Sequence, residues 1–171
     1  MMKLYIDFDG VILNTIDITY NIYKKNKNKF VDMQDFYKCL DWNELLKISS
    51  PINDSLNSIK KIIDSNLYDV YILSHVVTNN EAKYKKIFLE KNIPGIKLIT
   101  VPREIEKCDV VDAKNAILVD DYMGNLELWE AKGGIPIKFS DKGKSYNIMS
   151  IDRLDMLLDD YDNIKKLIKH R

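Results

Sequence analysis

The sequence predicts an α/β protein: a three-layer sandwich in which helices cover both faces of a mostly parallel central sheet. Short apolar runs typical of buried strands alternate with longer stretches of helical spacing, and this alternation indicates parallel βαβ units. One segment, from residue 14 to about residue 65, interrupts the alternation because it contains no convincing strand. A chain of 171 residues is long enough for one domain with a sizeable core.

Five apolar runs are expected to form the strands. They are residues 3–8, 70–73, 97–101, 116–119 and 136–139. Between them, residues 79–91 form a helix with Thr78 or Asn79 as its N-cap, and residues 126–132 form a helix that stops at two glycines. Apolar residues spaced by three and four predict one amphipathic helix over residues 152–171 that packs on the sheet.

The helical segment after the first strand is interpreted as a small lid. Its large side chains have helical rather than alternating spacing, so residues 14–65 are expected to form a helical cap on a core made of residues 1–13 and 66–171. Some of its aromatic side chains, Phe36, Tyr37 and Trp42 among them, suit contact with a substrate. The alternative is that each of these rings packs in the core of the lid itself.

The bulk composition excludes several classes of partner. Lys plus Arg and Asp plus Glu both total 26, so nothing favours a nucleic-acid polymer or an anionic membrane. No basic region followed by an apolar run precedes the first strand, so we expect no signal peptide, and no apolar run has membrane-spanning length. Two isolated cysteines, Cys39 and Cys108, fit free thiols in a reducing cytoplasm. We expect a cytoplasmic monomer or homodimer that acts on a small molecule.

Acidic residues follow two of the predicted strands. Asp7 and Asp9 come at the end of the first strand with Gly10 behind them, and Asp120 and Asp121 follow residues 116–119. Ligands of open α/β sheets bind outside the carboxyl ends of the strands, so these carboxylates are expected to meet at one edge. Such a cluster repels itself without a cation, and oxygen ligands suit a hard ion, usually Mg²⁺ beside a phosphate.

The order Asp-x-Asp-Gly-Val, then the strand-end Ser74, then Asp120-Asp121 resembles the haloacid dehalogenase-like hydrolase superfamily over nearly the whole chain. The resemblance implies a Rossmann-like core, and the insertion after the first motif is similar to the superfamily's C1-type cap. The short chain and the Ile-Leu-Val-Asp-Asp form of the last motif look most like the 5′(3′)-deoxyribonucleotidase branch.

The resemblance implies a role for each motif residue. Asp7 matches the nucleophile that becomes an aspartyl-phosphate, and Asp9 matches the general acid and base. Ser74 matches the hydroxyl that binds a phosphoryl oxygen. Asp120 matches the Mg²⁺ ligand, together with Asp7 and the backbone carbonyl of Asp9. Supporting roles fall to Gly10, which lets the chain turn, and to Asp121, which supports the metal or an incoming amide.

The superfamily also needs a lysine between phosphate and nucleophile. Lys107 lies thirteen residues before Asp120 and Lys114 lies six before it. Lys107 is preferred because Lys114 sits in a sequence typical of a turn just before the strand. A solvated surface lysine is the alternative for both.

His75 is a candidate substrate-binding residue rather than the base for Ser74, since neighbours on a strand point to opposite faces. The leading function is a Mg²⁺-dependent phosphatase acting on a small phosphomonoester, with a nucleoside 5′-monophosphate as one candidate. The enzymatic alternatives are a sugar-phosphate phosphatase and a phosphomutase. The non-enzymatic alternatives are a receiver-like domain and an inactive phosphate-binding domain.

Overall fold

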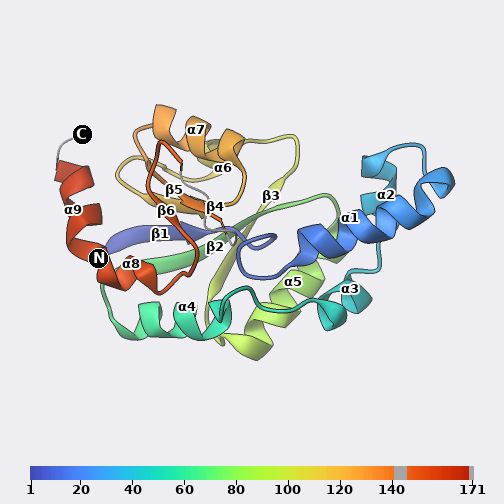
Figure 1. Cartoon of the computed structure of the whole chain (residues 1–171), viewed down its shortest axis with the longest axis horizontal. Helices are drawn as coiled ribbons and strands as arrows, with labels where there is room; N and C mark the ends of the chain where they lie inside the picture. The colour runs from blue at the N-terminus through green and yellow to red at the C-terminus, as the bar shows by residue number, and fades with distance from the viewer. Residues whose placement is uncertain (141–145, 170–171) are drawn as a thin grey trace.

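A computed structural model describes residues 1–140 and 146–169, and it contains the predicted α/β sheet (Figure 1). Six strands lie in the order β3-β2-β1-β4-β5-β6, and every neighbouring pair is parallel. Their bounds are Met2–Ile6 (β1), Tyr68–Val76 (β2), Lys97–Pro102 (β3), Ile117–Asp120 (β4), Ile135–Phe139 (β5) and Ser150–Ile151 (β6). The first strand therefore lies inside the sheet, between β2 and β4.

Helices cover both faces, as the predicted sandwich requires. Successive residues of a strand point to opposite faces; on β1, Leu4 and Ile6 join the larger apolar cluster and Tyr5 joins the smaller one. Helices α4 (Ser55–Asp64) and α5 (Asn79–Asn92) pack on the face of the larger cluster. Helices α6 (Lys107–Val110) and α7 (Met123–Ala131) lie on the opposite face (Figure 1).

The strands differ from the predicted ranges in two informative ways. β2 continues to Val76 because its last three residues pair with β3, so Ser74 lies within the strand rather than at its end. The two-residue strand β6 was not predicted, since so short a run carries no alternating pattern.

The segment from residue 14 to residue 65 is helical, as predicted. It contains α1 (Thr15–Asn26), the 3₁₀ helix η1 (Lys27–Lys29), α2 (Met33–Cys39), α3 (Trp42–Ile48) and α4. In Figure 1, α1, α2 and α3 lie beyond the carboxyl end of β1, whereas α4 runs beneath the sheet. Ile59 and Ile62 of α4 belong to the main apolar cluster. The division of the chain into core and cap stays a prediction.

The remaining helices confirm one boundary and correct another. Thr78 caps α5, since its hydroxyl accepts a hydrogen bond from Glu81 N at 3.1 Å. The prediction of one helix over residues 152–171 is wrong. The structure has α8 (Met156–Asp159) and α9 (Tyr161–Lys169), and residues 170–171 lie outside the described residues. Asp160 separates the two helices with φ −94° and ψ 8°, outside the helical region, and aspartate is a poor helix former.

Both cysteines are free thiols, as expected. None of the helices in the described part of the chain combines the length and apolar character that crossing a bilayer requires.

Candidate active site

The parallel register brings the two acidic motifs together at the carboxyl edge of the sheet. Ile6, the last residue of β1, pairs with Val119 of β4, so Asp7, which follows β1, lies beside Asp120, the last residue of β4. The backbone N–H of Asp7 donates to the carbonyl of Val119 at 2.9 Å. The predicted meeting of the carboxylates follows directly from this pairing.

Gly10 makes the turn that follows the first motif. Its φ is +73°, in the left-handed region that glycine adopts without strain. Its N–H donates to the carbonyl of Leu13 at 2.9 Å, and a Cβ added at this position would collide with the carboxylate of Asp121. The glycine therefore allows both the turn and the close approach of Asp121.

Lys107, the preferred of the two candidate lysines, lies between the two motifs. Its Nζ is 2.8 Å from Asp7 Oδ1 and 2.7 Å from Asp120 Oδ2, and the residue is 2% exposed. Burial alone would lower the pKa of Lys107, but the two carboxylates outweigh it and raise the pKa above its ordinary value. Lys114 is exposed before β4, where its backbone N–H donates to Asp112.

Three carboxylates at this edge form an acidic group. One oxygen from each of Asp7, Asp120 and Asp121 lies within 4.8 Å of the others. Burial raises the pKa of Asp7 to about 8, against the opposing effect of Lys107, and the neighbouring carboxylates add to the rise. Burial, followed by the charge of Asp120, raises the pKa of Asp121 to about 6. Burial and mutual repulsion disfavour the ionised forms of these carboxylates. A hard divalent cation, which binds oxygen ligands, would offset that cost.

Hydrogen bonds fix the carboxylate of Asp120. The backbone N–H of Tyr122 donates to Asp120 Oδ1 at 2.8 Å, and Asn125 Nδ2 donates to Oδ2 at 2.8 Å. Together with Lys107 they determine the orientation of this side chain. Asn125 was not singled out from the sequence, because the helix was predicted to begin at residue 126, whereas α7 begins at Met123 and places Asn125 in its first turn.

Asp9 stands apart from the acidic group and is held by other partners. Thr15 Oγ1 donates to Asp9 Oδ1 at 2.7 Å, and Lys85 Nζ contacts Asp9 Oδ2. Lys85 also pairs with Glu81 Oε1 at 2.6 Å. Lys85 and Glu81 were missed because α5 carries several lysines, and only the fold shows which of them turns inward.

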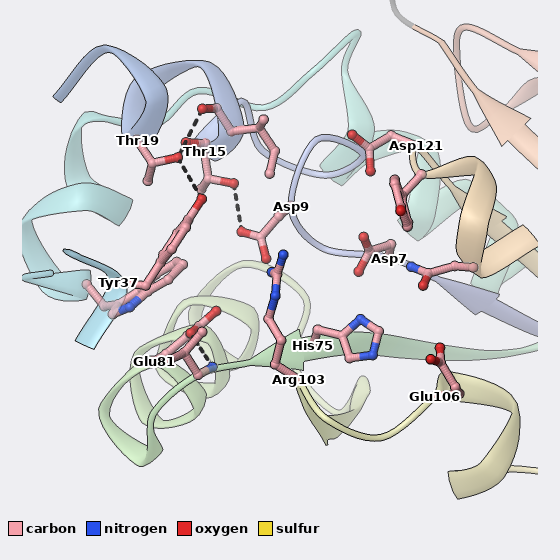
Figure 2. Close-up of a pocket in the computed structure, with 15 residues that line it drawn as sticks. Asp7, Asp9, Thr15, Thr19, Tyr37, His75, Glu81, Arg103, Glu106 and Asp121 are labelled. Carbon is pink, nitrogen blue, oxygen red and sulfur yellow. Dashed lines mark hydrogen bonds between the residues drawn. The ribbon is translucent and has the colours of Figure 1, made fainter. Parts of the chain in front are cut away.

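Ser74 and His75 point to opposite sides of β2, as the alternation of a strand requires. Ser74 is fully buried, and its hydroxyl accepts a hydrogen bond from Lys85 Nζ at 3.0 Å. His75 lines the cavity beside the acidic group (Figure 2). Its Nε2 is 3.0 Å from the carbonyl oxygen of Ile105. Burial lowers the pKa of His75 below its ordinary value.

A cavity of about 380 Å³ joins the acidic edge to the helical segment (Figure 2). From the core it is lined by residues that include Asp7, Asp9, His75 and Asp121, and from the helical segment by Thr15, Thr19, Tyr37 and Trp42. Arg103, exposed on the loop after β3, also lines it and extends toward its interior in Figure 2. Sequence reasoning did not single out this arginine.

Two of the three aromatic residues proposed to contact substrate, Trp42 and Phe36, occupy different surroundings. Trp42 lines the cavity and is 2% exposed, with Lys85 Nζ 4.8 Å from the centroid of its ring. Phe36 is absent from the described lining of the cavity, and its ring packs on Tyr23, Phe30 and Tyr37 at centroid distances of 5.3, 5.2 and 5.5 Å. This placement of Phe36 favours the alternative of a packing role.

Neither the protein-family models nor the curated proteins contain a match to this chain, but solved structures match its fold. A HAD hydrolase of family IA from Entamoeba histolytica aligns with a TM-score of 0.66 at 13% identity, covering 99% of this chain and 100% of its own. A HAD phosphatase from Thermococcus onnurineus gives 0.61 at 17%, with 98% of each chain covered. A D,D-heptose 1,7-bisphosphate phosphatase from Burkholderia thailandensis gives 0.59 at 14%, covering 94% of this chain and 98% of its own. The chain therefore has the Rossmann-like fold of haloacid dehalogenase-like (HAD) hydrolases, as the resemblance implied.

Proposed function

We propose that this protein is a phosphatase of the haloacid dehalogenase-like superfamily, which uses Mg²⁺ and hydrolyses a small phosphomonoester through an aspartyl-phosphate. One observation carries the proposal. Asp7 and Asp9 both follow β1 and line the same cavity. Lys107 bridges Asp7 to Asp120, whereas Asp9 is held by Thr15 and Lys85. Two carboxylates with different partners suit two different chemical roles.

In the first step, a carboxylate oxygen of Asp7 attacks phosphorus. The bond between phosphorus and the leaving oxygen breaks as Asp9 gives that oxygen a proton, so an alcohol departs and Asp7 carries the phosphoryl group. Lys107 offsets negative charge on Asp7 and on the phosphoryl oxygens. Asp7 attacks as the anion, so the positive charge of Lys107, which favours the ionised form of Asp7, also favours the reaction.

In the second step, water attacks the phosphorus of the aspartyl-phosphate. Asp9, now a carboxylate, takes a proton from that water. The bond between phosphorus and the Asp7 oxygen breaks, which releases inorganic phosphate and restores the Asp7 carboxylate. The two steps return both aspartates to their starting protonation states.

The donor set of the acidic group suits a divalent ion. Asp7 and Asp120 through their carboxylates, and Asp9 through its backbone carbonyl, would hold Mg²⁺, with Asp121 in support. When bound, Mg²⁺ supplies positive charge that screens the carboxylates from the phosphoryl oxygens.

The helical segment supplies the rest of the proposal. We propose that α1, α2 and α3 act as a C1-type cap that excludes water and selects the substrate. We also propose that α4, which the predicted cap over residues 14–65 includes, is part of the core, because its Ile59 and Ile62 lie in the main apolar cluster. Trp42, Tyr37 and the rim residue Arg103 would contact the leaving group, with His75 near the phosphoryl group. The predicted contact of the Ser74 hydroxyl with phosphate is also a proposal. In the structure this buried hydroxyl accepts a hydrogen bond from Lys85.

Two features bear on the class of substrate. The nucleotidase resemblance and the cap aromatics favour a nucleoside 5′-monophosphate. The polar lining of the cavity, with hydroxyls from Thr15, Thr19 and Tyr37, equally suits a sugar phosphate.

A phosphate-release screen tests the function. The purified chain would be incubated with Mg²⁺ and a panel of nucleoside monophosphates, sugar phosphates and p-nitrophenyl phosphate, with the Asp7→Asn variant as the matched blank. We expect inorganic phosphate from at least one substrate with wild type and none above background with the variant. Release from none of the panel would contradict the proposal, and binding of substrate without release would favour an inactive phosphate-binding domain.

A further inference from the structure

We propose that Lys85 is a positioning residue for Asp9: together with Thr15, it holds the Asp9 carboxyl group in the orientation from which its protonated form gives a proton to the leaving group. The inference rests on the proposed phosphatase function. It adds a second buried lysine to the site, with a role distinct from that of Lys107.

Lys85 gathers contacts from three parts of the molecule. Its Nζ donates to Asp9 Oδ2 on the loop after β1, to Glu81 Oε1 on α5 at 2.6 Å and to Ser74 Oγ on β2 at 3.0 Å. The carbonyl oxygen of His75 lies 3.2 Å from the same nitrogen. The ammonium group therefore ties the catalytic loop to both β2 and α5.

The surroundings of Lys85 separate it from the substrate. The side chain is fully buried, and it is absent from the described lining of the cavity. Its Nζ lies 5.2 Å from the ring centroid of Phe8 and 4.8 Å from that of Trp42. Lys85 would consequently act through Asp9, which does line the cavity, rather than by touching a phosphoryl oxygen.

A second donor holds the other oxygen of the same carboxylate. Thr15, the first residue of α1, is 1% exposed and donates to Asp9 Oδ1 at 2.7 Å. Donors from two different elements on two different oxygens fix the rotation of the carboxylate as well as its position. One donor alone would leave that rotation free.

Stability alone is a poor explanation for a lysine at this place. A buried ion pair often contributes no more to stability than apolar side chains of similar volume would, because both charges must be desolvated. Glu81 is itself 3% exposed, and its other oxygen accepts from the backbone N–H of Val77 at 2.8 Å. A methionine beside Phe8 and Trp42 would fill the same space. What methionine cannot do is orient Asp9.

The proposal predicts a selective kinetic defect. A misoriented general acid matters most when the leaving group is basic and needs a proton, and least when it departs as a stable anion. Hydrolysis of phenyl phosphate should therefore suffer more than hydrolysis of p-nitrophenyl phosphate. A merely structural loss would reduce both rates by the same factor.

The experiment compares kcat/KM for these two substrates in wild type and three variants. The double variant Glu81→Gln/Lys85→Met removes the lysine without leaving a buried unpaired glutamate. Thr15→Val removes the second donor and keeps the shape of the side chain. Lys86→Met is the matched control, the same substitution at the exposed neighbouring position on α5.

We expect the double variant to lose about tenfold or more in the ratio of kcat/KM for phenyl phosphate to that for p-nitrophenyl phosphate. Thr15→Val should change the ratio in the same direction, and Lys86→Met should leave it unchanged. Equal losses of kcat/KM on both substrates in the double variant, or no loss, would overturn the role of Lys85. If the double variant does not fold, an unchanged ratio of the two kcat/KM values in Thr15→Val would overturn it. A wild type inactive on both substrates and on the wider panel overturns the phosphatase function itself, and the inference with it.

Discussion

The ammonium group of Lys107 lies 2.8 Å from the Asp7 carboxylate, and both side chains are largely shielded from solvent. Lys107 is the first residue of α6, the short helix that follows β3 along the chain, whereas Asp7 follows β1. Their contact joins two segments that are one hundred residues apart, and it underlies the first prediction.

Replacing Lys107 by Met should reduce kcat by about 10²–10³, the usual cost of removing one preorganised donor from developing charge. The same substitution at Lys114, which is exposed, should leave kcat within about twofold of wild type. Steady-state kinetics on the best substrate from the screen decides between the two lysines. The assignment of Lys107 would be reversed if Lys114→Met caused the larger loss.

Asp7→Asn should abolish turnover and leave the fold intact. The amide has nearly the same shape as the carboxylate but is not a nucleophile, and it removes one charge from a cluster whose members repel each other. The melting temperature in EDTA at pH 8 should therefore equal or exceed that of wild type. Residual activity within tenfold of wild type would show that another group attacks phosphorus.

The stability of the metal-free protein should fall as pH rises from about 4 to about 8. Burial raises the pKa of Asp7 from 3.8 to about 8, so over this range the native protein keeps a proton that the unfolded chain has lost. The free energy of unfolding then decreases with pH, by up to about 1.4 kcal/mol per pH unit from this one group.

Urea denaturation in EDTA at several pH values checks this sign. The lowered pKa of His75 acts in the opposite direction but is common to wild type and Asp7→Asn. The difference between the two proteins should therefore isolate Asp7, with the variant showing the shallower decline. Parallel curves would contradict a raised pKa at Asp7.

Turnover should require a divalent ion. Without it, Asp7 and Asp120 face a dianionic phosphate with only one cation, the Lys107 ammonium, in contact with them among the described residues. Excess EDTA should stop phosphate release and Mg²⁺ should restore it, whereas Ca²⁺ should restore it poorly because its looser coordination misplaces the nucleophile. Mg²⁺ should also raise the melting temperature of wild type more than that of Asp120→Asn. Full activity in EDTA would exclude the metal.

The carboxyl-edge residues could be predicted from the sequence because a parallel sheet aligns strand ends. Asp7 and Asp120 each follow an apolar run, and the pairing of Ile6 with Val119 then brings them together. What the sequence could not provide was the end of β2. Ser74 looked like a strand-end residue, but pairing with β3 extends the strand beyond it.

The inward-facing lysines show a second limit. Lys107 could be preferred over Lys114 because only one of them sat in a turn-like sequence. Lys85 gave no such signal, since its burial depends on the packing of α5 against Trp42 and the loop after β1. Contacts between segments so far apart along the chain are set by tertiary packing rather than by local pattern.

The last prediction separates substrate recognition from packing in the helical segment, with two adjacent aromatic residues as a matched pair. Phe36→Ala should lower stability by about 3 kcal/mol or more, because the ring is 2% exposed and packs against Tyr23, Phe30 and Tyr37. In Phe36→Ala, the ratio of kcat/KM for the preferred substrate to kcat/KM for p-nitrophenyl phosphate should equal that of wild type.

Tyr37→Ala should instead change that ratio, because Tyr37 lines the cavity and its hydroxyl lies 3.4 Å from Thr19 Oγ1. Loss of one aromatic contact with a base is worth about 1–3 kcal/mol, so the ratio should fall by about one to two decades if the substrate is a nucleotide. Minimal phosphoesters, which carry no nucleobase to contact Tyr37, should be hydrolysed almost as before. Melting temperatures measured beside the kinetics distinguish the two positions: a changed ratio for Phe36→Ala, together with an unchanged ratio for Tyr37→Ala, would reverse the assignment and place Phe36 in the substrate pocket.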